Sequence, residues 1–290
     1  MRHLLRIAKH PRALLDSILT YPRFLGMIKP RLMTASFAQI AAVQSSISIS
    51  YWPARMECSV GARILAVSPH ADDETIGAGG LLIGHKDVSE IAVITIFNGE
   101  GGGNLASADG AKDYKERLIA KRRDELAAAC KYFHGQIIGR FDIPDGAEPA
   151  DFRAAAAKLR ELVRAFKPDV VVLPNFLDKQ QDHQTTNRLW ASACKDLHCM
   201  ILGSEIWSLH VAPNAYFEIG DTLAIKLLAI GEFDSQLATV DYLRLADGLA
   251  RVRGFQCPGV ARRSGAAEAF FAMPNVDYCD LVGTFFSAQS

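Results

Sequence analysis

The sequence lacks an excess of charge of either sign: across its 290 residues, 32 Lys and Arg balance 32 Asp and Glu. Such a chain does not provide the basic field that attracts nucleic acids, so we expect no nucleic-acid partner. The six cysteines are scattered and contain no C-x-x-C pair, a pattern typical of reduced thiols in a cytoplasmic protein. Because 49% of the residues are hydrophobic and only 22% are charged, the composition excludes a disordered chain and indicates a substantial core.

A long hydrophobic run is missing as well. Residues 32–54 carry no charge, but eight Ser, Thr and Gln side chains make this stretch too polar to span a bilayer. The residues before it carry seven Lys and Arg and one acid, Asp16, in an amphipathic pattern without a signal-peptide core. We therefore predict an accessory segment over residues 1–54 that precedes a domain at 55–290. Two interpretations of the basic part stay open: a peripheral contact at the inner face of the membrane, or an accessory helix packed on the domain.

From residue 61 onward, short apolar runs alternate with helical patterns. The runs that predict strands are "RILAVSPH", "EIAVITIFNGEGGG", "QIIGRFDIPDG" and "DVVVLPN". The segments that predict helices are "TIGAGGLLIGHK", "YKERLIAKRRDELAAACKYFHG", "PADFRAAAAKLRELVRAFKP" and "HQTTNRLWASACKDL", the last beginning at His183. This alternation predicts an α/β, Rossmann-like three-layer fold with a mostly parallel, doubly wound sheet. We expect residues 201–290 to add one or two strands and a helix to the same domain.

Polar side chains follow every predicted strand, in "PHADDE", "NGEGGG", "IPDG" and "PNFLDKQQDHQTT". In a parallel sheet the carboxyl ends of the strands meet at one edge, and ligands bind there. We therefore expect these four loops to form a single site.

Three adjacent carboxylates, Asp72, Asp73 and Glu74, repel one another, and one acid would be enough to cap the following helix. A divalent metal ion would offset that repulsion. His70 and Asp73 lie three residues apart at a turn and can reach one ion, while His183 supplies a third ligand from the fourth loop. Two imidazoles and a carboxylate with an open position are typical of catalytic zinc, although Fe²⁺ fits the same ligands.

Asp72 is then available as the general base that takes a proton from a water activated by the metal. Glu74 either orients a ligand histidine or caps the helix. Taken alone, His183 is equally consistent with a helix-capping or surface histidine. Its position after the fourth strand favours the ligand role.

The stretch "SPHADDETIGAGG" resembles the P-H-P-D-D-E signature of the LmbE/PIG-L family of metal-dependent deacetylases. The resemblance extends from residue 61 to residue 275. "FNGEGGG" is similar to the glycine-containing loop of the family, Arg122 and Glu125 match its R-x-x-E helix, "IPDG" matches its P-D-G turn, and "AEAF" matches a recurrent C-terminal piece. The resemblance implies removal of the N-acetyl group from N-acetylglucosamine-type sugars on inositol, lipid or glycan acceptors.

Carried over residue by residue, the resemblance implies the same three zinc ligands and the same general base. It also implies that Arg122 and Asp145 bind substrate or support the ligands. We expect the same of four further side chains: Glu74, Asn98, Gln180 and Asp182. Two positions depart from the family pattern, because Ala71 replaces a proline and Gln180 in "QQDH" replaces the first histidine of H-x-D-H.

The second departure affects the chemistry. Glutamine can donate a hydrogen bond to an oxyanion, but it cannot deliver a proton to a leaving amine. Three alternatives follow. Asp72 acts as acid as well as base, another group such as His210 or His85 supplies the proton, or the site is inactive or repurposed.

The sequence as a whole predicts a cytoplasmic, zinc-dependent N-deacetylase of glycan biosynthesis, with one ion per chain. Its substrate would be an N-acetylglucosamine-type sugar, either in a small molecule or on a lipid- or glycan-linked intermediate. One alternative is a deacylase of a small N-acyl glycoside, such as a thiol or an antibiotic precursor. The other is a non-catalytic metal- or sugar-binding relative. The sugar acceptor and the oligomeric state stay open.

Overall fold

The structure is a computed structural model that describes residues 53–102, 111–257 and 259–287. The accessory segment predicted over residues 1–54 lies almost entirely outside these ranges, and both interpretations of it stay predictions. Every helix in the described ranges is too short or too polar to cross a bilayer.

The described strands form one mixed sheet in the order β1-β7-β8-β6-β5-β2-β3-β4. Their bounds are β1 (Ala54–Arg55), β2 (Arg63–Ser68), β3 (Glu90–Phe97), β4 (Gln136–Ile143), β5 (Val170–Pro174), β6 (Met200–Ser204), β7 (Ala215–Glu218) and β8 (Ala267–Pro274). Strands β2 to β6 pair in parallel, whereas β8 runs antiparallel to both β6 and β7. The sheet confirms the prediction of a mostly parallel, Rossmann-like α/β fold.

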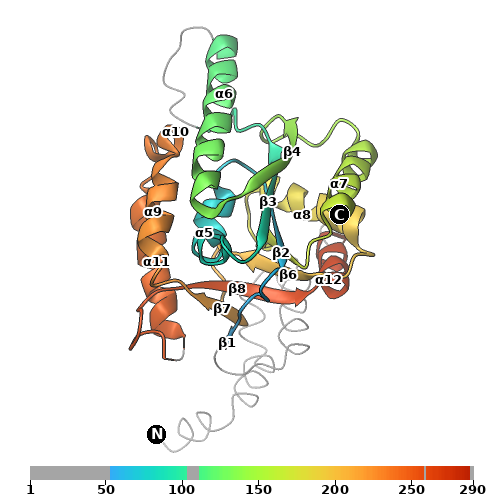
Figure 1. The fold of residues 1–290 in the computed structure, drawn as a ribbon. Coiled ribbons are helices and arrows are strands. Elements are labelled where there is room, and N and C mark those ends of the chain that lie inside the picture. Colours follow the sequence, from blue (N-terminus) through green and yellow to red (C-terminus); the bar gives the residue numbers. More distant parts are fainter. Residues whose placement is uncertain (1–52, 103–110, 258, 288–290) are drawn as a thin grey trace, which may run out of the picture. The chain divides into compact units, whose positions relative to one another are not determined.

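Helices cover both faces of this sheet, which makes the predicted three layers (Figure 1). On one face lie α5 (Asp73–His85), α6 (Ala111–Cys130), the short 3-10 helix η1 (Lys131–Phe133), α9 (Leu223–Gly231), α10 (Asp234–Leu237) and α11 (Tyr242–Gln256). On the other lie α7 (Phe152–Phe166), α8 (Gln181–Cys194) and α12 (Asn275–Ser287). Strands β2, β3 and β5 are buried along almost their whole length because helices cover both of their faces.

The expectation for residues 201–290 was wrong in its element count. The described part of this region contains two whole strands, most of β6, and four helices, not one or two strands and a helix. Strand β8 was missed because Glu268 interrupts its apolar pattern. That carboxylate is buried all the same, since it accepts hydrogen bonds from the Lys226 ammonium and from two backbone amides of α5.

Candidate active site

The turn from β2 into α5 carries the carboxylates that the sequence singled out. Asp72 has a φ angle of 144°, a backbone conformation that residues with a side chain rarely adopt and that often marks functional sites. Helix α5 follows at once and is buried from Asp73 to Ile83. The glycines of α5 allow the helix to pack closely against its neighbours, since a Cβ atom on Gly80 would lie only 2.7 Å from Ile219 Cγ2.

Three predicted ligands meet at this turn. The Asp73 Oδ2 atom lies 3.3 Å from His70 Nδ1 and 3.3 Å from His183 Nε2, and the ligand atoms of all three residues are within 4.8 Å of one another. His183 has an exposed fraction of 0%, yet neither of its ring nitrogens makes a hydrogen bond of good geometry. A buried ring nitrogen that lacks a well-formed hydrogen bond is costly, and two imidazoles with a carboxylate are typical metal ligands, so this donor set fits a divalent cation.

Two further carboxylates hold the histidine rings. Asp182 Oδ2 lies 2.9 Å from His70 Nε2, and Asp178 Oδ2 lies 3.3 Å from His183 Nδ1. Carboxylates in such positions fix the tautomer and orientation of metal-ligating imidazoles. Asp182 was expected to support the site. Asp178 was missed, although an acid five residues before a candidate ligand in the same loop is a signal that could have found it.

The charges of the cluster favour protonated rings when no metal is bound. Burial opposes a charged ring, but hydrogen bonds to Asp182 and Asp73 and the charges of Asp73 and Asp145 raise the pKa of His70 to about 10. Burial also opposes the charge on His183, and Asp73 and Asp178 outweigh it to give a pKa of about 9. The same pairings hold the pKa of Asp73 below its usual range, although burial acts in the opposite direction.

Metal binding is therefore expected to release protons. A histidine must be neutral to coordinate a metal, so protons compete with the ion until the pH approaches about 10, the higher of the two pKa values. Calorimetry in buffers of different ionisation enthalpy should show proton release, and the metal affinity should increase from about pH 6 upward. An affinity that does not depend on pH over this range would contradict the assignment of the two histidines.

Asp72 lies in a different environment from its neighbour. Its Oδ1 atom is 3.2 Å from Arg122 Nη2, which also donates to the Ala71 carbonyl at 2.7 Å. Burial raises the pKa of Asp72 to about 7, together with the charges of Asp73 and Glu74 and against that of Arg122. A carboxylate with a pKa near neutrality can accept and return a proton.

The glycine loop after β3 lies beside the same cluster. The Asp145 carboxylate accepts hydrogen bonds from the Gly99 and Gly101 amides at 2.7 and 2.8 Å, and its Oδ1 atom is 3.9 Å from His70 Nε2. Asn98 exchanges hydrogen bonds with Glu100 in that loop. The contacts join the loops after β2, β3 and β4 to Asp182 at the start of α8, which confirms that the four loops converge.

The family comparison agrees with this arrangement. Residues 65–194 match a family model described as PIG-L, GlcNAc-PI de-N-acetylase. Over these residues, a little under half of the chain, the sequence is similar to a PIG-L domain. The resemblance seen in the sequence is therefore confirmed, and so is the class of the protein, a deacetylase-type hydrolase of a metal-dependent family. A search of curated protein sequences finds no match.

Solved structures share the fold of this domain at low sequence identity. An N,N'-diacetylchitobiose deacetylase from Pyrococcus horikoshii is 22% identical with a TM-score of 0.61, over 75% of this chain and 85% of that one. A 4-carboxy-2-hydroxymuconate hydratase from Pseudomonas putida is 21% identical with a TM-score of 0.59, over 73% and 96%. A zinc-inhibited teicoplanin deacetylase is 17% identical with a TM-score of 0.54, over 73% and 98%.

Glu74 and Glu125 hold the fold together, and in the described residues their hydrogen bonds go to neither His70 nor His183. The Glu74 carboxylate accepts hydrogen bonds from the Ser68 and Thr75 hydroxyls and from the Asp72 amide, so it orders the turn and does not orient a ligand ring. Its buried position also argues against the substrate-binding role. Glu125 joins α6 to α10 by accepting from the Ser235 amide and hydroxyl.

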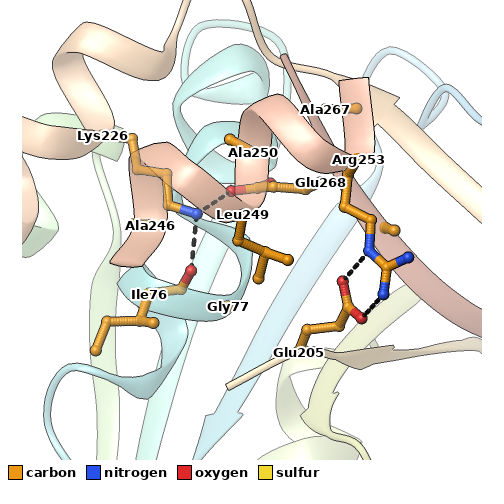
Figure 2. Close-up of a pocket in the computed structure, with 11 residues that line it drawn as sticks. Ile76, Gly77, Glu205, Lys226, Ala246, Leu249, Ala250, Arg253, Ala267 and Glu268 are labelled. Atoms are coloured by element: carbon orange, nitrogen blue, oxygen red, sulfur yellow. Dashed lines mark hydrogen bonds and ion pairs between the residues drawn. The ribbon is translucent and has the colours of Figure 1, made fainter. Parts of the chain in front are cut away.

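The "AEAF" piece is likewise structural. Figure 2 shows Glu268 bound to Lys226, whose Nζ atom also donates to the Ile76 carbonyl at 2.7 Å. The cavity beside these residues has a volume of about 20 Å³, which is room for a water molecule and far too little for a sugar.

Gln180 caps the N-terminus of α8. Its Oε1 atom accepts a hydrogen bond from the His183 amide at 2.9 Å, and its Nε2 atom lies 3.4 Å from Asp182 Oδ2. The helix consequently begins at Gln181, two residues before the predicted start at His183, with Gln180 as its N-cap. The residue that replaces the family histidine thus positions the ligand-bearing turn.

Replacing Gln180 by Ala should lower the free energy of unfolding by about 1 kcal/mol, the usual effect of losing an N-cap. The matched variant Gln180→Asn places another capping amide there and should retain most of the stability. Urea unfolding of the three proteins measures the difference. Equal stability of the wild type and Gln180→Ala would contradict the capping role.

Proposed function

We propose that this chain hydrolyses the acetamide of an N-acetylglucosamine-type sugar with a zinc ion held by His70, Asp73 and His183. The supporting observation is one buried cluster: three ligand atoms within 4.8 Å of one another, directly beside Asp72, a carboxylate whose pKa burial raises to about 7. The PIG-L match supports the reaction class. The zinc ion would be one per chain, and Fe²⁺ fits the same donors.

When bound, the ion would polarise the acetamide carbonyl and make a water nucleophilic. Asp72 takes a proton from the attacking water as the water oxygen bonds to the carbonyl carbon. The Arg122 guanidinium lowers the free-energy cost of the buried negative charge on Asp72. The carbon–nitrogen bond then breaks as the nitrogen gains a proton. The products are acetate and a free amino sugar.

Asp72 is also the proposed source of the proton for the leaving nitrogen. Gln180 cannot supply one. His210 is held in the interior by Gly203 and Asn175, and His85 lies at the other end of α5, where its Nδ1 atom is 2.8 Å from the Leu81 carbonyl oxygen. Because these three side chains are unsuited to the role, we assign both steps to Asp72. It takes a proton from the water and returns it to the amine.

The comparisons and the charge pattern support the proposed substrate class. The matching family is described as a GlcNAc-PI de-N-acetylase, and similar structures include deacetylases of a chitobiose and of teicoplanin. We favour a lipid- or glycan-linked amino sugar as the substrate of a cytoplasmic protein, and both interpretations of the basic N-terminal segment stay open. The teicoplanin neighbour supports a second candidate, a small N-acyl glycoside.

A product analysis tests the proposal. The zinc-loaded protein is incubated with N-acetylglucosaminyl-phosphatidylinositol, N,N'-diacetylchitobiose and methyl N-acetylglucosaminide, and acetate and free amine are measured. We expect the two products in equal amounts from at least one of these substrates. Failure to release acetate from any of them at stoichiometric zinc would overturn it and would favour the non-catalytic relative.

A further inference from the structure

A short loop after β6, residues 205–210, is fixed by charges that the proposed reaction does not use. Glu205 and Arg253 are both buried, and the Arg253 Nε atom donates to Glu205 Oε2 at 2.8 Å. The Arg253 Nη2 atom also donates to Glu205 Oε1, so the pair is bidentate (Figure 2). The pair also ties both ends of the loop: Glu205 Oε1 accepts from the His210 amide at 2.6 Å, and Arg253 donates to the His210 carbonyl at 2.9 Å.

A buried ion pair contributes little net stability over apolar residues of the same size, and its attested use is to select one conformation. Here the selected conformation presents an indole. Trp207, inside the loop, has an exposed fraction of 53%. A large aromatic side chain held rigidly in water is a typical binding anchor, because little conformational freedom is lost when a ligand covers it.

The loop is joined to the candidate active site on two sides. Asp178, which faces His183, accepts hydrogen bonds through its Oδ2 atom from the Trp207 amide at 3.2 Å and from the Ser208 amide at 3.3 Å. On the other side, the Trp207 ring meets the Tyr242 ring edge to face, with centroids 6.0 Å apart. Tyr242 packs in the same apolar cluster as Ile76, one turn of α5 beyond Asp72.

We infer that Trp207 is the platform on which the pyranose ring of the substrate stacks while its acetamide reaches the metal ligands. The inference rests on the proposed function and specifies its binding site. One face of a pyranose ring presents C–H groups, which pack well on an indole, and the ring hydroxyls stay in water. Leu209 and Val211 are also exposed, but in the described residues no hydrogen bond ties them to the metal ligands.

The test compares Trp207→Ala with Val211→Ala, a control on an apolar side chain near the same loop with an exposed fraction of 95%. Calorimetry measures the binding of glucosamine and methyl N-acetylglucosaminide, and KM is measured for that glycoside and for acyclic N-acetylethanolamine. Trp207→Ala should weaken sugar binding about tenfold and raise the glycoside KM to match. The KM of the acyclic amide should not change, and Val211→Ala should behave as wild type.

Sugar affinity within twofold of wild type in Trp207→Ala would overturn the inference. Co-sedimentation with anionic phosphatidylglycerol vesicles gives a second outcome. If both variants lose it equally while their sugar affinity is unchanged, the loop is a membrane contact and the inference is overturned. Because glucosamine binding requires no hydrolysis, the two proposals can fail separately. Trp207-dependent binding without acetate release would overturn the proposed reaction and support the platform.

Discussion

Asp72→Asn is expected to lower the rate of acetate release about a thousandfold while the metal content stays at the wild-type value. An amide cannot take the proton of the attacking water or return one to the nitrogen. The nearest charged partner of Asp72 is Arg122, at 3.2 Å, whereas Asp73 is the carboxylate between the two histidines. The two adjacent acids should therefore respond differently, with Asp73→Asn losing metal first.

The experiment measures acetate release and metal content on the same preparations. Asp124→Asn is a matched control, because Asp124 is an exposed acid on α6, away from the cluster. It should equal wild type in both measurements. Asp72→Asn with activity within a few-fold of wild type would assign the general base to another group.

His183→Ala is expected to lower metal affinity by more than about a hundredfold, since even the loss of a partner behind a ligand costs 10- to 100-fold. The ring is fully buried, and its Nε2 atom lies 3.3 Å from Asp73 Oδ2. Asp178→Asn should give a smaller loss, about 10- to 100-fold, because the ring stays in place with a weaker partner on Nδ1. Competition with a chelator of known affinity measures both variants.

His134→Ala is the matched control for this series, since His134 is exposed and its ion-pair partner is the exposed Asp87. Its metal affinity should be that of wild type. Unchanged metal content in His183→Ala would remove His183 from the site.

The central fold could be predicted because its strands are covered on both faces. β2, β3 and β5 then read as nearly unbroken apolar runs, and each is followed by the polar loop that marks its carboxyl end. β8 could not be predicted in the same way. Its Glu268 is neutralised by Lys226, 42 residues earlier in the chain, and no local pattern reveals such a pairing.

In the candidate site, too, some features could be predicted from the sequence and others depend on tertiary contacts. His70, Asp73 and His183 could be predicted to lie together because strand ends of a parallel sheet meet at one edge. The tasks of Glu74, Gln180 and Asp178 depend on which backbone amide or ring nitrogen each side chain reaches. Acids and amides beside a strand end look alike in sequence whether they bind a ligand, cap a helix or orient a ring.

The most direct measurement is the rate of acetate release while zinc is titrated into the metal-free protein. The rate is expected to increase linearly and to stop increasing at one zinc per chain, whereas Asp72→Asn should bind the zinc without releasing acetate. Acetate release that does not depend on zinc would contradict the account, as would a saturated protein that releases none.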